Sequence, residues 1–340
     1  GRGHDPGGAE ATASGELAVC CPACPRPGIN LPEGWDCASK EDRCVFIYFM
    51  YFALDACFRL KRGMVSSELK DPGLGTGWAY MLENMSYHEY LLTVTDQKEM
   101  SMCSGLAALD YANTKFSRGY SSTGVGMGVC ARHEFVQPNG DVDSVSGCGL
   151  YANIDYIFGS ILRYYDERLF KMVSYDIACH WWKLLMERMI EQPPLVRYLL
   201  IMPLIAFVIP KMHIKGHIPK CGTLYSLSLI PGSGQTDGEG IERPWANIGG
   251  IASSTRIMGP GARHDTIDDH WGHWNWQKLV SVTITRYASD TLRCRLDNAC
   301  EQEIVHTEAL DSFSQQQQER VESWKKMVHD YEDDRSKKNP

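Results

Sequence analysis

A long apolar run, "CVFIYFMYFALDACFRL" from Cys44 to Leu60, most limits what this chain of 340 residues can fold into. The run does not alternate between apolar and polar residues, so a strand built from it buries both of its faces. Sheets that are covered by helices on both sides accommodate such strands. The run is too short to span a membrane and contains Asp55. We therefore expect the central strand of an α/β sheet.

Other segments of the chain alternate between strand and helix patterns, which favours an α/β architecture. Expected strands are 123–136, 171–179 and 205–214, and expected helices are 97–113, 150–169, 180–190 and the charged C-terminal tail. Residues 138–144, "PNGDVDS", have the composition of a turn, and residues 221–235 that of a polar loop. The expected organisation is a Cys- and Pro-rich segment (1–43), a central α/β domain (44–280) with an insertion at about 63–122, and a helical tail (281–340).

The composition sets limits on function. The formal net charge of −8 argues against a broad basic footprint for nucleic acid, although it leaves a local basic channel open. The polar, Gly-rich N-terminus has no apolar core of a signal peptide, and we expect a soluble chain with no membrane partner. The thirteen cysteines are therefore expected to be reduced thiols and metal ligands rather than disulfides.

Two aspartates end strand-like segments and predict a metal site. Asp55 ends the central apolar run, and Asp176 ends the short strand in "MVSYDIAC". A buried aspartate is costly unless it is paired or bound to a cation. If the two strands are neighbours, their carboxylates meet, and "TDGEGIERPWANI" adds Glu239 or Glu242 from a helix start. Mg²⁺ or Mn²⁺ would relieve the repulsion among these acids, and two such ions support phosphodiester chemistry.

Structural roles for the same acids remain open. Either aspartate alone can be a turn cap or a salt-bridge partner. Thr236 and Glu239 match a capping box, but a helix that began there would place Pro244 well inside it. A helix that began near Gly240 would keep Pro244 in the first turn, with Glu242 on the helix and Glu239 in the loop before it.

Cysteine and histidine pairs suggest zinc. Cys21 and Cys24 have the Cys-x₂-Cys spacing of one half of a zinc site. The alternative is that they are unpaired cysteines in a turn. A second set, which could form one zinc centre near the acids, consists of Cys130, His133, His213, His217 and Cys221. Prolines around the last three favour strand and loop over a helix. The alternative is that His213 and His217 are hydrogen-bonded in the core or contact DNA.

Basic and aromatic residues near the acids could contact DNA. The basic candidates for phosphate contact are Arg59, Lys61, Arg62, Arg243 and Arg256. Solvation or neutralisation of nearby acids is the favoured role for these residues. Trp271, Trp274 and Trp276 could stack on bases, although core packing is the favoured role.

Several long segments between about Gly1 and Lys278 share the motifs and order of a known family. They include "LDACFRLKR", "VSYDIACHWWKLLMERM", "PKMHIKGHIPKC" and "TDGEGIERPWANIGG". In these segments the chain resembles the KDZ (Kyakuja, Dileera and Zisupton) transposases of mushroom-forming fungi. "CPACPRPGINLPEGW" resembles the cysteine-containing (CxC2-like) segment that precedes their catalytic core.

The resemblance implies an RNase H-like fold of the DDE transposase and retroviral integrase superfamily, a mixed sheet flanked by helices. It implies that Asp55, Asp176 and Glu239 or Glu242 hold two Mg²⁺ or Mn²⁺ ions, with DNA as the partner and the nucleus as the location. A homo-oligomer is a further expectation. The chain begins abruptly, and we expect a truncated protein. The alternatives are a catalytically inactive, zinc-stabilised remnant that binds DNA or protein, and, less favoured, a zinc hydrolase built on His213, His217 and Cys221.

Overall fold

The computed structural model describes residues 6–37, 39, 46–94, 119–143, 150–284, 286–334 and 337–339. The chain divides into two compact units, residues 1–278 and 279–340. The helix expected at 97–113 lies outside the described residues.

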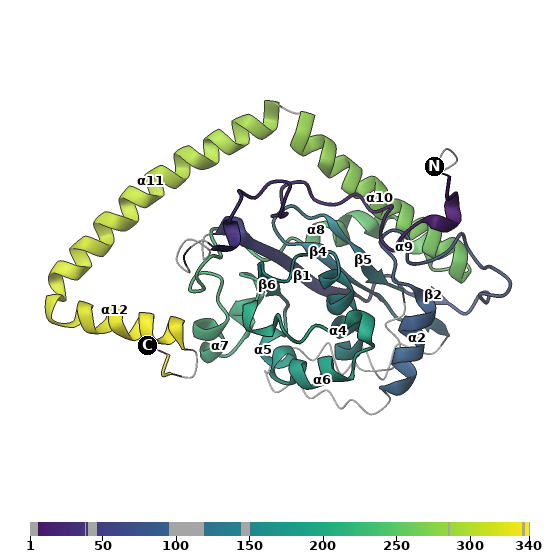
Figure 1. Ribbon diagram of the computed structural model, residues 1–340, viewed down its shortest axis with the longest axis horizontal. Helices are drawn as coiled ribbons and strands as arrows, with labels where there is room; N and C mark the ends of the chain where they lie inside the picture. The colour runs from purple at the N-terminus through teal and green to yellow at the C-terminus, as the bar shows by residue number, and fades with distance from the viewer. Residues whose placement is uncertain are drawn as a thin grey trace. The chain divides into compact units, whose positions relative to one another are not determined.

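The first unit contains a five-stranded mixed sheet (Figure 1). Its strands are β1 (Phe49–Cys57), β4 (Val125–Cys130), β5 (Val136–Val142), β6 (Phe170–Ser174) and β7 (Ile205–Val208). They lie in the order β5-β4-β1-β6-β7. β4 is antiparallel to both β1 and β5, whereas β6 and β7 run parallel to β1. β1 is therefore the central strand, as its apolar run predicts.

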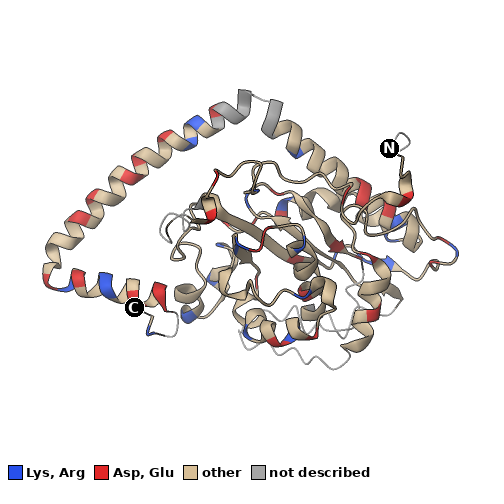
Figure 2. Cartoon of the chain, in the orientation of Figure 1, with Lys and Arg blue, Asp and Glu red and all other residues tan. Residues whose placement is uncertain are grey.

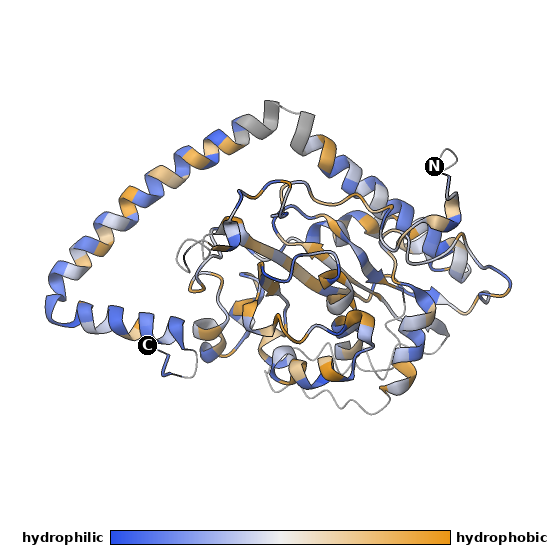
Figure 3. Cartoon of the chain, viewed as in Figure 1, coloured by the Kyte–Doolittle hydropathy of each residue, from blue (hydrophilic) through white to orange (hydrophobic). Residues whose placement is uncertain are grey.

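Helices cover both faces of the sheet. On one face, α4 (Leu150–Leu162) packs so closely that a Cβ atom on Gly128 would lie 2.2 Å from Ile161 Cδ1. On the other face, α8 (Glu242–Ile248) and α10 (Pro260–Ile284) bring Trp245 and Trp271 into the core cluster that contains Tyr51. Figure 3 shows hydrophobic residues gathered on the strands and on α4. The α/β class is confirmed.

The remaining helices and a small second sheet complete the described part of the chain. The helices are α2 (Asn84–Thr93), α5 (Ala178–Trp181), α6 (Leu185–Glu191), α7 (Pro219–Leu224), α9 (Ala252–Thr255), α11 (Arg286–Gln316) and α12 (Gln318–Asp333). β2 (Arg62–Gly63) and β3 (Tyr120–Ser122) form a two-stranded sheet. The 3-10 helices are η1 (Ala9–Ala11), η2 (Trp35–Cys37), η3 (Phe46–Tyr48), η4 (Trp182–Leu184), η5 (Pro194–Val196), η6 (Met202–Leu204), η7 (His213–Gly216) and η8 (Gly249–Ile251).

The turn predicted at 138–144 is wrong, because most of these residues belong to strand β5. β5 is the last strand in the order of the sheet, and Pro138 lies within it although the whole strand is buried. Its outer edge is hydrogen-bonded to residues 79–82, since the N–H groups of Asn139 and Asp141 donate to the carbonyls of Ala79 and Tyr80. Asn139 adopts a left-handed conformation with φ of 44°, which asparagine tolerates better than most residues. The pairing of β4 with β5 shifts register between Met127 and Val129, so the strand absorbs the turn-like residues as an irregularity.

Other predicted elements differ at their boundaries. The helix expected at 150–169 ends at Leu162, and the one expected at 180–190 is divided into α5, η4 and α6. The polar loop expected from Cys221 is helical at its start, since α7 extends to Leu224. Pro219 is compatible with this helix because it occupies the first position, where its missing N–H is not needed.

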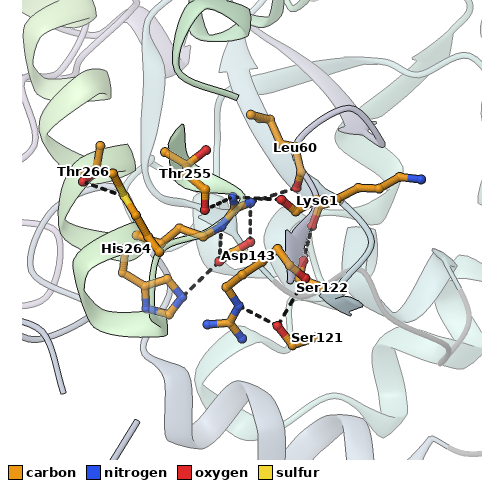
Figure 4. Close-up of polar contacts among 12 residues, drawn as sticks. Leu60, Lys61, Ser121, Ser122, Asp143, Thr255, His264 and Thr266 are labelled. Atoms are coloured by element: carbon orange, nitrogen blue, oxygen red, sulfur yellow. Dashed lines mark hydrogen bonds and ion pairs between the residues drawn. The ribbon is translucent and has the colours of Figure 1, made fainter. Parts of the chain in front are cut away.

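A buried ion pair joins α10 to the sheet (Figure 4). Arg263 Nε donates to Asp143 Oδ2 at 2.7 Å, and neither side chain is exposed to solvent. The same guanidinium donates to the backbone carbonyls of Leu60, Lys61 and Thr255 at 2.8 to 3.3 Å. Arg263 therefore holds the chain that leaves β1, the end of α9 and Asp143 in one network.

The second unit consists of helical segments, in agreement with the helical tail expected from the sequence. Acidic and basic residues are distributed along α11 and α12 (Figure 2). Phe313 and Trp324 stack with ring centroids 6.0 Å apart and join the two helices. Among the described residues, no helix has the length and apolar character needed to cross a membrane.

Candidate active site and metal centres

The parallel pairing of β1 with β6 brings Asp55 and Asp176 to the same end of the sheet. The register places Ala53 opposite Ser174, and each aspartate follows two residues later along its own chain. Asp55 lies within β1 and Asp176 in the turn after β6, and the two carboxylates are close enough for the charge of Asp176 to act on Asp55. α8 contacts Asp55, since Trp245 Nε1 donates to Asp55 Oδ2 at 3.0 Å.

Asp55 is held where its ionised form is unfavourable. Partial burial raises the pKa of its carboxyl to about 7, and the negative charges of Asp176 and Glu242 add to this rise. The hydrogen bond from Trp245 opposes it. The ionised form of Asp55 is therefore disfavoured mainly by burial and secondly by the neighbouring negative charges.

The loop before α8 brings two glutamates to the same place. Gly238 has a φ of 79° and packs against Ser174, and a Cβ atom on Gly240 would lie 2.4 Å from the carbonyl oxygen of Ala131. Glycine at both positions lets the loop pass between the ends of β4 and β6. Glu239, between them, is 8% exposed and accepts a hydrogen bond from the Met212 backbone N–H at 2.8 Å.

The capping-box interpretation is wrong and the later helix start is confirmed. α8 begins at Glu242, its N-cap residue is Ile241, and no side chain caps it. Pro244 lies in the first turn, where a proline is tolerated. Glu242 is exposed at the start of the helix, and Glu239 lies in the loop before it.

His213 links the acids, a role that sequence reasoning missed. Its Nδ1 pairs with Asp176 Oδ1, and its Nε2 lies 3.9 Å from Glu239 Oε2. The hydrogen bond to Asp176 outweighs partial burial and, with the charges of Asp176, Glu239 and Glu242, raises the pKa of His213 to about 9. Ligand atoms of His213, Glu239 and Glu242 lie within 4.8 Å of one another. The position of His213 shortly after Pro210 in the sequence gives no indication of its contact with Asp176.

The chemistry of this group of side chains suits divalent cations. We call Asp55, Asp176, Glu239 and Glu242 the acid cluster. Its carboxylate oxygens are the donors that Mg²⁺ and Mn²⁺ prefer. Of these four acids, Glu239 and Glu242 place ligand atoms within 4.8 Å of each other and of His213, and the charges of Asp176 and Glu242 act on Asp55.

A separate cluster of soft ligands lies on the first unit. Cys21, Cys24, Cys130 and His133 place their sulfur and nitrogen atoms within 4.8 Å of one another. Cys24 Sγ lies 3.2 Å from Cys130 Sγ, and His133 Nδ1 lies 3.3 Å from Cys21 Sγ and 3.4 Å from Cys130 Sγ. A tetrahedral zinc ion with bonds of about 2.0 to 2.3 Å separates its ligand atoms by about 3.5 to 3.8 Å. The cluster could therefore hold a metal ion such as zinc.

This arrangement corrects the predicted grouping of the zinc ligands. Cys130 and His133 combine with Cys21 and Cys24 and not with the histidines near the acids. The reason is topological: Cys130 ends β4 and His133 lies in the turn after it, where both meet the N-terminal segment. No spacing in the sequence reveals that contact.

The remaining predicted ligands are also divided. His213 faces the acid cluster, whereas His217 and Cys221 combine with Cys179, which sequence reasoning missed. Neither the single five-residue centre nor the His213-based zinc hydrolase therefore agrees with the structure. Cys179 follows Asp176 by three residues in "DIAC", and this proximity was the available signal.

The predicted DNA-contacting residues have different surroundings. Arg243 pairs with Glu134 at 2.8 Å and with Asp237 at 3.3 Å, so its charge is largely balanced within the chain. Arg62 Nε donates to Ser121 Oγ at 2.9 Å, and Lys61 Nζ lies 5.2 Å from the centre of the Tyr120 ring. Two further candidates are exposed, namely Arg59 and Arg256.

Two of the three tryptophans in "DDHWGHWNW" belong to the core. Trp271 is fully buried and donates to Asp141, and Trp274 donates to the carbonyl of Glu134 at 2.7 Å. Trp276 is 57% exposed. Core packing is therefore confirmed for the first two, and only Trp276 offers a face to a base.

The fold and these side chains define an α/β protein with an acid cluster where two parallel strands end and with two clusters of cysteine and histidine side chains. The family model of the Kyakuja-Dileera-Zisupton transposases matches residues 48–275, well over half of the chain. The chain belongs to this KDZ transposase family. No curated protein and no solved structure matches it.

Proposed function

We propose that this chain is a metal-dependent DNA transposase. It cleaves a phosphodiester at a transposon end and joins the freed 3′-hydroxyl to target DNA. The observation that supports this most is the acid cluster, since Asp55, Asp176 and Glu242 come from three distant segments and the charges of the last two act on the carboxyl of Asp55. Family membership agrees with the same activity.

The acids have different roles in this proposal. Asp55, Asp176 and Glu242 would hold Mg²⁺ or Mn²⁺, and such ions would supply activation of a water or hydroxyl and stabilisation of the leaving oxygen. Glu242 is preferred to Glu239 as the third ligand because it is exposed and its charge reaches Asp55. One carboxylate oxygen of Glu239 accepts a hydrogen bond from the Met212 backbone N–H, and the other oxygen orients His213.

His213 has a supporting role. Its raised pKa keeps the imidazole protonated at neutral pH in the cation-free chain. A protonated His213 beside Asp176 and Glu239 partly neutralises the acid cluster, so the site keeps its arrangement before a cation and DNA arrive.

The sheet supports an RNase H-like assignment. Three consecutive strands of the sheet, β1, β4 and β5, form an antiparallel meander. Two later strands, β6 and β7, are parallel to β1 on its other side. In the RNase H-like arrangement that the family resemblance implies, the first acid belongs to the central strand and the second follows its parallel neighbour. Asp55 and Asp176 have these positions.

DNA is the proposed partner and the nucleus the proposed place of action. The net charge of −8 requires a local basic surface, and candidates besides Arg59 and Arg256 are three lysines of the segment around His213, namely Lys211, Lys215 and Lys220. These residues would position the phosphate backbone without reading bases. A homo-oligomer acting on paired transposon ends is part of the same proposal.

A second candidate is a zinc-stabilised remnant that binds DNA or protein without cleaving it. The cluster of Cys21, Cys24, Cys130 and His133 favours it, because this cluster has a full set of four ligands and does not include the acids. The fold could therefore keep zinc after losing catalysis.

Nicking of supercoiled plasmid DNA distinguishes the two candidates. We expect Mn²⁺-dependent nicking by the full chain that Asp55→Asn and Asp176→Asn each abolish. Glu242→Gln should reduce it at least 100-fold, about 2.7 kcal/mol of transition-state stabilisation, and Glu239→Gln should reduce it less. Asp311→Asn, an exposed acid of α11, is the control that should nick normally.

Two results would overturn the first candidate. Nicking that persists unchanged in Asp55→Asn and Asp176→Asn would show that the acid cluster is not the catalytic site. A folded, zinc-loaded chain that never nicks DNA would favour the remnant.

A further inference from the structure

A second group of thiol and imidazole side chains lies beside Asp176. It consists of Cys179 in α5, His217 directly after η7, and Cys221 in α7. Their ligand atoms lie within 4.8 Å of one another, and Cys179 Sγ is 3.6 Å from His217 Nδ1. The side chains of Cys179 and Cys221 are 3% and 5% exposed.

The composition of this group is that of a zinc site. Buried cysteines commonly act as small apolar residues, but an imidazole nitrogen between two of them needs a polar partner. Two thiolates and one imidazole are soft and borderline ligands that zinc takes in preference to Mg²⁺. The 3.6 Å between Cys179 Sγ and His217 Nδ1 agrees with the separation of about 3.5 Å across a tetrahedral zinc ion.

His217 is also held from outside the group. Its ring forms a hydrogen bond with the backbone of Asp176. Histidines that bind a metal commonly use their other nitrogen on a backbone carbonyl or a carboxylate, which orients the ring toward the ion. The contact with Asp176 therefore joins the group to the acid cluster through one residue.

We propose that Cys179, His217 and Cys221 bind a second zinc ion, distinct from the four-ligand cluster and from the acid cluster. Three protein ligands leave one position of a tetrahedral ion for a water molecule. The ion joins α5, which follows β6, to the η7–α7 segment, which follows β7. No metal of the acid cluster is needed for this site.

The consequence for the acid cluster rests on the proposed function. Cys179 is three residues after Asp176, and His217 is four residues after His213. A zinc ion that joins Cys179 to His217 therefore holds the segments that carry Asp176 and its partner His213. We infer a positioning role for it, in which loss of zinc loosens the acid cluster without removing any of its carboxylates.

Zinc content of the purified full chain tests the site directly. By elemental analysis we expect two zinc ions per chain in the wild type and one in the double variant Cys179→Ser/Cys221→Ser. Cys21→Ser/Cys24→Ser should also retain one, since it removes the other cluster. Cys294→Ser/Cys300→Ser, which changes exposed cysteines of α11, should retain both.

Substitutions of His217 keep the test valid if the double variant misfolds. His217→Cys should keep the second zinc because a thiolate replaces the imidazole, whereas His217→Ala should bind it at least tenfold more weakly. Hydrogen exchange should then accelerate in residues 211–225 and not in β1. These measurements do not involve DNA, so they can succeed even if nicking is never seen.

The proposal is overturned if the wild type holds one zinc ion and Cys179→Ser/Cys221→Ser leaves that number unchanged. It is also overturned if the double variant retains two ions. If both zinc ions bind as expected but hydrogen exchange around His213 is unchanged in His217→Ala, the positioning role is refuted and the binding site stands.

Discussion

Replacement of Asp55 by asparagine tests the electrostatics on which the proposed site depends. Asparagine keeps an oxygen that can accept the hydrogen bond from Trp245 Nε1, and it removes the ionisable group. In the wild type, burial and the charges of Asp176 and Glu242 raise the pKa of Asp55 from 3.8 to about 7. The substitution therefore removes a charge that the folded chain holds at a disadvantage.

The sign and size of the effect follow from proton linkage. Between about pH 4 and pH 7 the folded chain binds more protons at Asp55 than the unfolded chain does, so the free energy of unfolding falls as pH rises through this window. A shift of about 3 units corresponds to at most about 4 kcal/mol, at about 1.36 kcal/mol per unit. Because Asp55 is partly exposed, solvent screening reduces this to about 2 kcal/mol.

Urea unfolding of the zinc-loaded chain, in buffer passed over a chelating resin, measures this difference. At pH 8, Asp55→Asn should be about 2 kcal/mol more stable than the wild type, and the gain should vanish toward pH 4. Mn²⁺ at ten times its dissociation constant should stabilise the wild type by about 1.4 kcal/mol at pH 8 and the variant much less.

Asp141→Asn is the matched control. Asp141 is a buried aspartate that accepts a hydrogen bond from Trp271, much as Asp55 does from Trp245, and burial raises its pKa well above the usual value. Its asparagine variant should keep the full response to Mn²⁺. The reasoning fails if Asp55→Asn is less stable than the wild type at pH 8, or if Mn²⁺ stabilises both chains equally.

Three further predictions concern other contacts. His213→Ala should lower the free energy of unfolding by about 1 kcal/mol at pH 6, after allowance for solvent screening. The raised pKa of His213 stabilises the fold below the unfolded pKa of 6.5, and this stabilisation is lost as pH rises through about 9. An equal cost at pH 10 in urea unfolding would contradict it. Arg263→Met should cost about 3–5 kcal/mol in the same assay by leaving Asp143 buried without its partner, and a cost below about 1 kcal/mol would refute the pairing. Cys130→Ser should lose one zinc ion and lower the melting temperature, whereas Cys294→Ser should do neither; equal zinc content in both variants would rule out the four-ligand cluster.

The local pattern of residues was sufficient to predict the central strand and the positions of two acids along the chain. The apolar run around β1 must bury both faces, whatever the rest of the chain does, and Asp55 and Asp176 are conspicuous because acids rarely end such strands. The range of possible first residues of α8 could also be limited from the sequence, because Pro244 restricts where the helix begins; the helix starts at Glu242. The functional role of these acids stays a prediction.

Contacts between distant segments could not be predicted from the sequence. "PNGDVDS" has the composition of a turn, yet most of it is a strand because β4 pairs with one side of it and residues 79–82 are hydrogen-bonded to the other. Cys24 meets Cys130, and His213 meets Asp176, across separations that no local spacing encodes. Local sequence sets burial and backbone preference residue by residue, whereas a metal site or an ion pair depends on which segments the sheet brings side by side.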